Sequence, residues 1–286
     1  SGPVDLLPYD VVILQRDREH KFQLRFEDEH WFSIGLDDIP PWLSFRDITE
    51  GMKANLSLVL FHVSAHDNES RVERLAVMTD GQVTREDQFP PDDVEIGLRL
   101  SDGPHSIVIS AMDDWMNTKY AHFNISIDTF SPCLFITSPL NGTVTNLDII
   151  SVNGTVKDGR IVLIGDESVT VMADGTFSNE VVLPDEGQNP LRVRAIDDFN
   201  NSIEVVLVVI RDTTPPSLEI QGLPELTNRT TIEIRGSSDG MYISITPPGI
   251  EMPVEGSFSF DVALEEGENN FSVTASDAVG NIATRS

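Results

Sequence analysis

Acidic side chains recur at two kinds of position along this 286-residue chain, and their chemistry is that of metal ligands. One kind lies in short turns between two apolar stretches. The other lies just after an apolar stretch, four residues before a proline. The turn positions are Asp113, Asp197 and Asp277, and the positions before a proline are Asp128 and Asp212. Ca²⁺ prefers six to eight oxygen ligands, carboxylates included, so these five residues are the candidate ligands. Alternatively, they accept hydrogen bonds from nearby backbone N–H groups, as Asp does in many turns.

Catalytic chemistry is not indicated by any pattern in the chain. There is no GxSxG elbow, HExxH pair, phosphate-binding loop or dinucleotide-binding glycine pattern. The only cysteine, Cys133, follows a proline where a strand is expected, and we predict a small buried apolar residue rather than a nucleophile. The sequence therefore predicts a non-enzyme with no catalytic residues and no cofactor site, with Ca²⁺ at the joints between modules as the one candidate ion.

The acidic turns belong to a long internal repeat. Residues 102–132 are matched by residues 186–216 without a gap, and residues 266–281 give a third, partial copy. The copies share a glycine, an alanine, an aspartate and an asparagine: Gly103, Gly187 and Gly267; Ala111, Ala195 and Ala275; Asp113, Asp197 and Asp277; Asn117, Asn201 and Asn281. Upstream, DGTFSNEVVL (174–183) is matched by EGSFSFDVAL (255–264), and TNLDIISVNG (145–154) is matched by TNRTTIEIRG (227–236). A period above 80 residues indicates a whole small domain duplicated in tandem rather than a solenoid.

Apolar and polar residues alternate within each copy, as in Phe271, Val273 and Ala275 against Ser272 and Thr274. This period of two is typical of a half-buried β-strand. Short strands separated by regular turns, with no helical stripe, predict an all-β protein of tandem β-sandwiches. An antiparallel last strand starts at the acidic turn and ends at the opposite pole. Asp212 should therefore meet the near end of the next module rather than its own turn.

Short proline-containing linkers, Asp128 to Pro132 and Asp212 to Pro216, mark the expected domain boundaries because proline stiffens the chain. We expect an amino-terminal β segment at 1–45, either part of a further sandwich or packed on the first module. The three modules are expected at 46–131, 132–215 and 216–286, the last strand of the third being short or truncated.

The pattern DG-x-F-S, then EG-x-N-x-V-x-A-x-D-x-x-GN and D-T-T-P-P, resembles the tandem Ig-like modules of bacterial and archaeal surface proteins. It is also similar to the Ig-like accessory domain of glucodextranase-type enzymes. The third copy is the most faithful; Met116 and Asn200 replace the turn glycine in the other two. The resemblance implies an immunoglobulin-like fold, and large adhesins of this architecture imply Ca²⁺ at the joints between modules.

Composition limits the partners. The net charge of −28 argues against nucleic acid and anionic membrane surfaces, and the longest apolar run is too short to span a bilayer. Asn-x-Ser/Thr sequences are more frequent than chance placement would give, which favours export and N-glycosylation. The candidate acceptors are Asn55, Asn68, Asn124, Asn141, Asn153, Asn200, Asn228 and Asn270.

These observations predict an extracellular or cell-surface region: a stiff array of Ig-like modules for adhesion, a stalk or a surface layer. The alternative is an accessory region of a secreted hydrolase that spaces the enzyme or targets it to carbohydrate. The partners would be other surface proteins or glycans, with no membrane insertion in this part of the chain. Trp31 and Trp42 are the candidate ligand-contact aromatics, and Trp42, after two prolines, is the one most expected to be exposed.

Overall fold

The computed structural model describes residues 13–16, 21–25, 31–35 and 37–286, and for the first three ranges only the backbone. Every regular element in these residues is a β-strand, so no helix there could cross a membrane. Contacts divide the chain into two compact units. The first holds residues 1–130 with 198–201, and the second holds residues 131–197 with 202–286.

The amino-terminal segment contains a small antiparallel sheet of three strands in the order β1-β2-β3. Its strands are β1 (Ile13–Arg16), β2 (Lys21–Arg25) and β3 (Trp31–Gly35). Among the described residues this sheet pairs with no strand of the first module. The side chain of Trp31, a candidate ligand contact, lies outside what the structure describes.

The first module is a sandwich of two sheets, ordered β4-β6-β9 and β5-β11-β10-β7-β8. Its strands are β4 (Trp42–Arg46), β5 (Lys53–Ala54), β6 (Leu58–His66), β7 (Val72–Thr79), β8 (Gln82–Gln88), β9 (Asp93–Arg99), β10 (Gly103–Asp113) and β11 (Thr118–Ile127). Strand β4 pairs with β6 and packs Leu43 and Phe45 against the core. The module therefore begins before residue 46, where the sequence placed its start, because this first strand shares only its alternation with the other copies.

The second module repeats this arrangement with sheets ordered β12-β14-β17 and β13-β19-β18-β15-β16. Its strands are β12 (Cys133–Ser138), β13 (Val144–Thr145), β14 (Ile149–Lys157), β15 (Ile161–Ile164), β16 (Glu167–Val169), β17 (Thr176–Val182), β18 (Gly187–Ile196) and β19 (Ser202–Arg211). Cys133 is exposed, contrary to the expectation of burial. The strand alternates, and its next residue, Leu134, is the one that faces the core.

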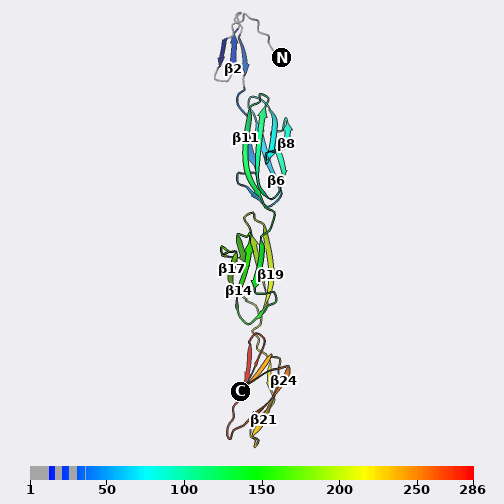
Figure 1. Ribbon diagram of the computed structural model, residues 1–286, viewed down its shortest axis with the longest axis vertical. Helices are drawn as coiled ribbons and strands as arrows, with labels where there is room; N and C mark the ends of the chain where they lie inside the picture. The colour runs from blue at the N-terminus through cyan, green and yellow to red at the C-terminus, as the bar shows by residue number, and fades with distance from the viewer. Residues whose placement is uncertain (1–12, 17–20, 26–30, 36) are drawn as a thin grey trace. The chain divides into compact units, whose positions relative to one another are not determined.

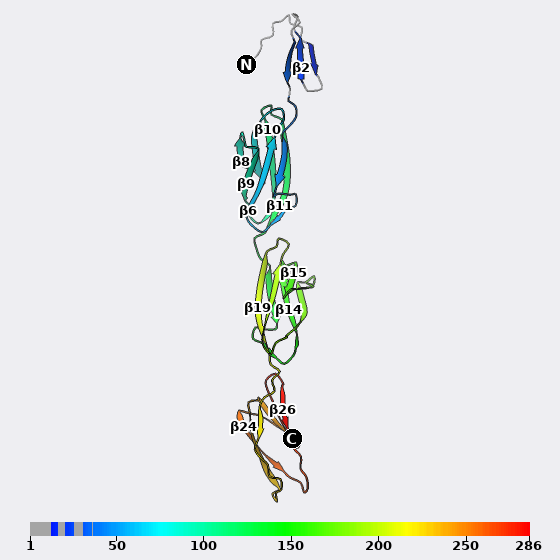
Figure 2. The ribbon, with the colours of Figure 1, turned by 180° about the vertical axis from the view of Figure 1, so that it is seen from behind.

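The third module has sheets ordered β20-β21-β24 and β23-β22-β25-β26. Its strands are β20 (Leu218–Ile220), β21 (Thr231–Ser238), β22 (Tyr242–Thr246), β23 (Ile250–Pro253), β24 (Gly256–Ala263), β25 (Ser272–Ser276) and β26 (Ile282–Arg285). The last strand is four residues long, against ten for its counterpart β19. Figures 1 and 2 show the two layers of each sandwich from opposite sides.

Each module has its own apolar core between its two sheets, and no core is shared between modules. Ala111, Ala195 and Ala275, the alanines shared by the repeat, are fully buried. The predicted all-β, tandem immunoglobulin-like architecture is therefore confirmed.

The repeated glycine of the SVNG and EIRG segments is explained by close packing against a repeated phenylalanine. A Cβ on Gly236 would lie 2.3 Å from the carbonyl oxygen of Glu219 and 2.4 Å from Cζ of Phe258. Gly154 meets Phe135 and Phe177 in the same way. Only glycine leaves room for the aromatic ring of the neighbouring strand at this point.

Candidate functional site

The acidic turn of the repeat joins the last two long strands of each module, and its carboxylate organises the turn. In the first module, Oδ1 of Asp113 accepts the backbone N–H groups of Trp115 (2.8 Å) and Asn117 (2.9 Å), and Oδ2 accepts Nδ2–H of Asn117 (2.8 Å). In the third module, Asp277 makes the same three bonds with Val279 and Asn281. The aspartate and the asparagine of the repeat are therefore one hydrogen-bonded unit.

These bonds also set the charge of Asp277. Burial alone would raise the pKa of its carboxyl group, but the side chain and backbone of Asn281 and the backbone N–H of Val279 donate to it. These donors favour the ionised form and hold the pKa below its usual value. The turn is thus built around a carboxylate rather than a neutral acid.

The asparagine of each turn also reaches the linker that leads into its module. Its Nδ2 donates to the backbone carbonyl of the linker aspartate in all three modules: Asn117 to Asp37 (3.1 Å), Asn201 to Asp128 (2.8 Å) and Asn281 to Asp212 (2.8 Å). Asp212 directly follows β19, so Asn281 ties the turn of the third module to the end of the second. This is the meeting that the antiparallel course of the last strand predicts.

A second contact holds the linker from the other side. Glu186, at the end of the second module, accepts the backbone N–H of Thr213 (2.9 Å) and the hydroxyls of Thr213 (2.8 Å) and Thr214 (3.1 Å). Hydrogen bonds from Thr213 and Thr214 and the charge of Arg211 lower the pKa of Glu186. In the first module, Asp102 accepts the N–H and hydroxyl of Thr129 in the same way. We call the two contacts together, from the asparagine and from the acidic residue, the linker clamp.

The five predicted metal ligands have different surroundings. Asp128 and Asp212 lie in the linkers, where their Oδ1 atoms accept the N–H groups of Phe130 (3.0 Å) and Thr214 (3.1 Å). Asp197 is buried in its turn, and Asp277 is engaged as described above. Of the five predicted ligands, Asp113 alone belongs to a group of three potential metal-ligating side chains found among the described residues.

The two carboxylates that join Asp113 were missed by sequence reasoning. Asp37 and Asp67 each place one oxygen in a group with Asp113 whose members all lie within 4.8 Å of one another. The signal for Asp37 was present: Asp37 to Pro41 has the same spacing as Asp128 to Pro132 and Asp212 to Pro216. Asp67 directly follows β6, as Asp239 directly follows β21, but the residues around the two aspartates differ, so comparison of the repeats did not detect this match.

Beside this acidic group lies a groove of about 440 Å³, lined in part by Pro41, Trp42, His66, Glu69 and Lys119. The side chain of Trp42 is 65% exposed. An exposed indole next to polar and charged groups can stack against an apolar face of a ligand. Of the predicted aromatics, Trp42 thus lies at a hollow in the surface.

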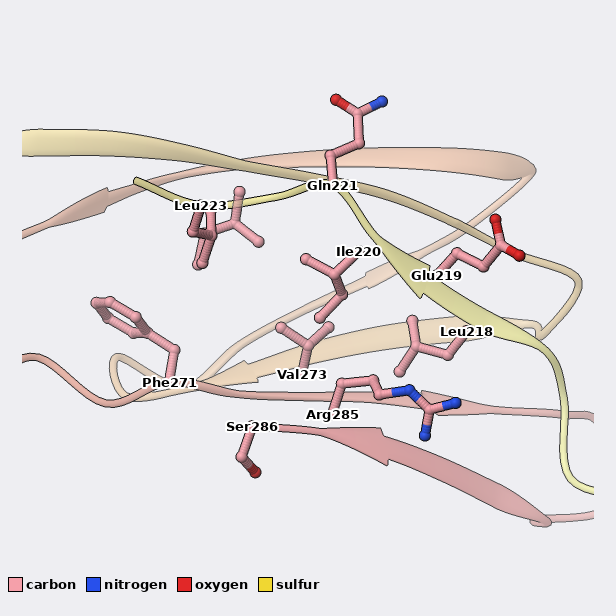
Figure 3. A pocket seen from close by; sticks show the side chains of 10 residues that line it. Leu218, Glu219, Ile220, Gln221, Leu223, Phe271, Val273, Arg285 and Ser286 are labelled. Carbon is pink, nitrogen blue, oxygen red and sulfur yellow. The ribbon is translucent and has the colours of Figure 1, made fainter. Parts of the chain in front are cut away.

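The third module contains a pocket of about 590 Å³ between its sheets, lined by both apolar and polar side chains (Figure 3). Leu218, Ile220, Phe271 and Val273 point into it, and Arg285 and Ser286 lie at its edge. In the second module, Leu191, the counterpart of Phe271, pairs with the buried Leu207 in the second half of β19. At the place of this pocket, the second half of β19 covers the core of the second module. We assign the pocket no ligand.

None of the candidate glycosylation sites is buried. Asn68, Asn124, Asn141, Asn200, Asn228 and Asn270 are exposed, while Asn55 and Asn153 are half-buried. Asn124 and Asn141 already use their side chains in hydrogen bonds, to Glu50 and to the N–H of Val208. Glycosylation at the eight positions stays a prediction.

Comparison with known proteins finds a family match within the second module. Residues 132–213 match the family described as Glucodextranase, domain B. The second module is similar to that domain. Over 160 residues, 52% of this chain, the sequence is 31% identical to Bacillopeptidase F of Bacillus subtilis (strain 168). The chain covers 11% of that relative's length, so about nine tenths of the relative has no counterpart here.

Solved structures of low similarity also align. The fibronectin(III)-like modules of Clostridium thermocellum CbhA align at 14% identity, with 60% of this chain and 94% of that chain covered and a TM-score of 0.40. A structure of a 1.5-MDa bacterial ice-binding adhesin aligns at 16% identity, covering 87% and 96% of the two chains, with a TM-score of 0.37.

Proposed function

We propose that this chain is a non-catalytic spacer of a secreted or surface-attached protein, in which hydrogen-bonded linkers restrain the angle between successive Ig-like modules. The linker clamp carries the proposal. An asparagine and an acidic residue from the two ends that meet at a linker both bind its backbone. The residues that recur in the sequence are therefore those that hold linkers, rather than those that would shape a reaction site.

Small-angle X-ray scattering on the whole chain tests the restraint. One arrangement of modules should fit the wild-type profile, whereas a chain carrying Asn281→Ala and Glu186→Gln should need an ensemble of arrangements. A wild-type profile that already needs a broad ensemble would overturn the proposal. Asn228→Ala, an exposed asparagine outside any clamp, is the matched control and should leave the profile unchanged.

Export is part of this proposal. An acidic chain with several exposed N-glycosylation sequences suits the outside of a cell, where the partners would be surface proteins or glycans. Expression in a glycosylating host, followed by mass spectrometry of peptides containing the eight asparagines, would measure which of them can carry sugar. Fully unmodified peptides would remove this support for export.

A second candidate function is an accessory region that positions an enzyme, and the two named relatives favour it. Both names, glucodextranase and Bacillopeptidase F, are those of enzymes, and this chain matches only a small part of the second. The Trp42 groove supplies a place where carbohydrate could stack. Binding to a glycan array that Trp42→Ala abolishes, and that Phe135→Ala, at an exposed ring of the second module, preserves, would support targeting. No glycan binding would leave the spacer role alone.

A further inference from the structure

We propose that the first module binds one Ca²⁺ ion between the carboxylates of Asp37, Asp67 and Asp113, an inference that goes beyond the spacer role. The three residues come from separate parts of the chain: the linker before β4, the turn after β6 and the turn after β10. Their ligand oxygens all lie within 4.8 Å of one another. Oxygens bound to one Ca²⁺ at about 2.3–2.6 Å can lie up to about 5 Å apart, so the group matches that span.

One of these carboxylates is buried without a partner for one of its oxygens. Asp37 is 8% exposed, and its Oδ1 accepts the backbone N–H of Ile39 at 3.0 Å. Its Oδ2 is buried and accepts no hydrogen bond from the described residues. Leaving a carboxylate oxygen in this state is costly, and an ion bound there would remove the cost.

The hydrogen bonds of the other two carboxylates orient them but do not use all their lone pairs. Oδ1 of Asp67 accepts the N–H groups of Glu69 (2.9 Å) and Ser70 (2.8 Å), which leaves Oδ2 without a bond in the described part of the chain. Asp113 has one bond on Oδ2, from Asn117, and so keeps a lone pair there. Three preoriented oxygens are therefore available, and water would complete the coordination.

The clustering of three acidic side chains favours a bound cation. Asp113 is fully buried and Asp37 nearly so, and within the described ranges no lysine or arginine forms an ion pair with any of the three carboxylates. When ionised, carboxylates at this separation repel one another strongly where water is excluded. A divalent cation with a preference for oxygen ligands offsets this repulsion directly.

The other modules contain the counterparts of two of the residues, which provides matched controls. Asp212 corresponds to Asp37 in the linker, and Asp277 corresponds to Asp113 in the turn. The counterpart of Asp67 in the third module is Asp239, but this carboxylate accepts the N–H of Ser217 at 2.7 Å instead of joining the other two. Asp212→Asn is therefore the control for Asp37→Asn, because both asparagines can still accept the N–H group two residues along.

Isothermal titration of the chelator-treated full chain with CaCl₂ tests the site. We expect one Ca²⁺ per chain, an affinity weakened by about tenfold or more in Asp37→Asn and in Asp67→Asn, and wild-type affinity in Asp212→Asn. Terbium luminescence gives a second measurement, since the indole of Trp115 belongs to the turn of Asp113 and should sensitise a bound Tb³⁺. Trp115→Phe should lower that emission without altering Ca²⁺ affinity. Absence of saturable binding, or equal weakening by Asp37→Asn and Asp212→Asn, would overturn the proposal.

Discussion

The first and third modules share a turn and a linker bond but use them in different surroundings. In both, an asparagine in the acidic turn donates to the carbonyl of the preceding linker aspartate. In the first module, the carboxylate of the neighbouring turn, Asp67, joins the other two in one acidic group, whereas its counterpart in the third module, Asp239, accepts a backbone N–H. The repeat therefore preserves the contacts that hold the linker, and differences in a neighbouring turn decide whether a third carboxylate joins the acidic group.

The cores of the first and third modules differ at one position of the equivalent strands β6 and β21, which pair with β9 and β24. Gly236 lies against Phe258 in the third module, and the registers place Val63 beside Val94 at the same position in the first. We expect Gly236→Ala to destabilise the third module by about 3 kcal/mol, since its Cβ would overlap Glu219 and Phe258. Val63→Ala should lower the stability of the first module by about 1–2 kcal/mol through a small cavity.

Module-resolved hydrogen exchange on the whole chain measures both changes, because core amides report the stability of their own module. Each substitution should lower protection in one module only. Loss of protection in both modules at once would contradict the finding of separate cores.

The next largest expected effect comes from removing the hydrogen bond between Asn281 and the linker residue Asp212. Asn281→Ala removes the donor to Asp212 and to Asp277, and we expect a loss of about 1–2 kcal/mol in the third module. Asn270→Ala, at an exposed residue in the same module, is the control and should change stability little. Chemical denaturation followed by hydrogen exchange would show the difference, and equal effects of the two substitutions would speak against a structural role for Asn281.

The turn residue before the asparagine has a positive φ in both modules: 70° at Met116 and 91° at Gly280. Methionine is strained there and glycine is not. Because Met116 is 80% exposed, Met116→Gly should stabilise the first module by up to about 1 kcal/mol, and Gly280→Met should destabilise the third by a similar amount. The denaturation midpoint should rise for Met116→Gly and fall for Gly280→Met. A shift in the same direction for both substitutions would contradict the assignment of equal backbone conformations to the two turns.

The smallest expected difference between the first and third modules is a pH dependence of stability that only the first should show. Burial alone would lower the pKa of His105, but hydrogen bonds to Asp80 and to the Ser101 carbonyl, and the charge of Asp80, raise it above 6.5. The stabilisation of the first module by protonated His105 is fully present below pH 6.5, and it is lost as the pH rises through the raised pKa of His105. The third module has Asn269 at this position and should show no such change.

His105→Asn copies the residue of the third module and should remove this pH dependence from the first. Hydrogen exchange of the first module between pH 6 and pH 8 measures it. A slope that survives the substitution would assign the effect to another group.

Much of the fold follows from sequence because alternation and repetition are strong signals. Phe271, Val273 and Ala275 identified a strand, and the shared Asp and Asn identified a turn. Strand β4 was harder to place, since its Trp42-Leu43-Ser44-Phe45 matches the other copies in pattern but not in residue type. The acidic group was predicted only through Asp113, because the meeting of Asp37 and Asp67 depends on a linker and a turn that are brought together only in the folded module.

The central claim is that the linker clamp fixes the angle between modules. It can be tested by pulsed electron paramagnetic resonance with one spin label on the exposed Cys133 and another on Glu251→Cys in β23 of the third module. The account predicts a single narrow distance distribution that broadens when Asn281→Ala and Glu186→Gln are added. A wild-type distribution already as broad as that of the variant would contradict it.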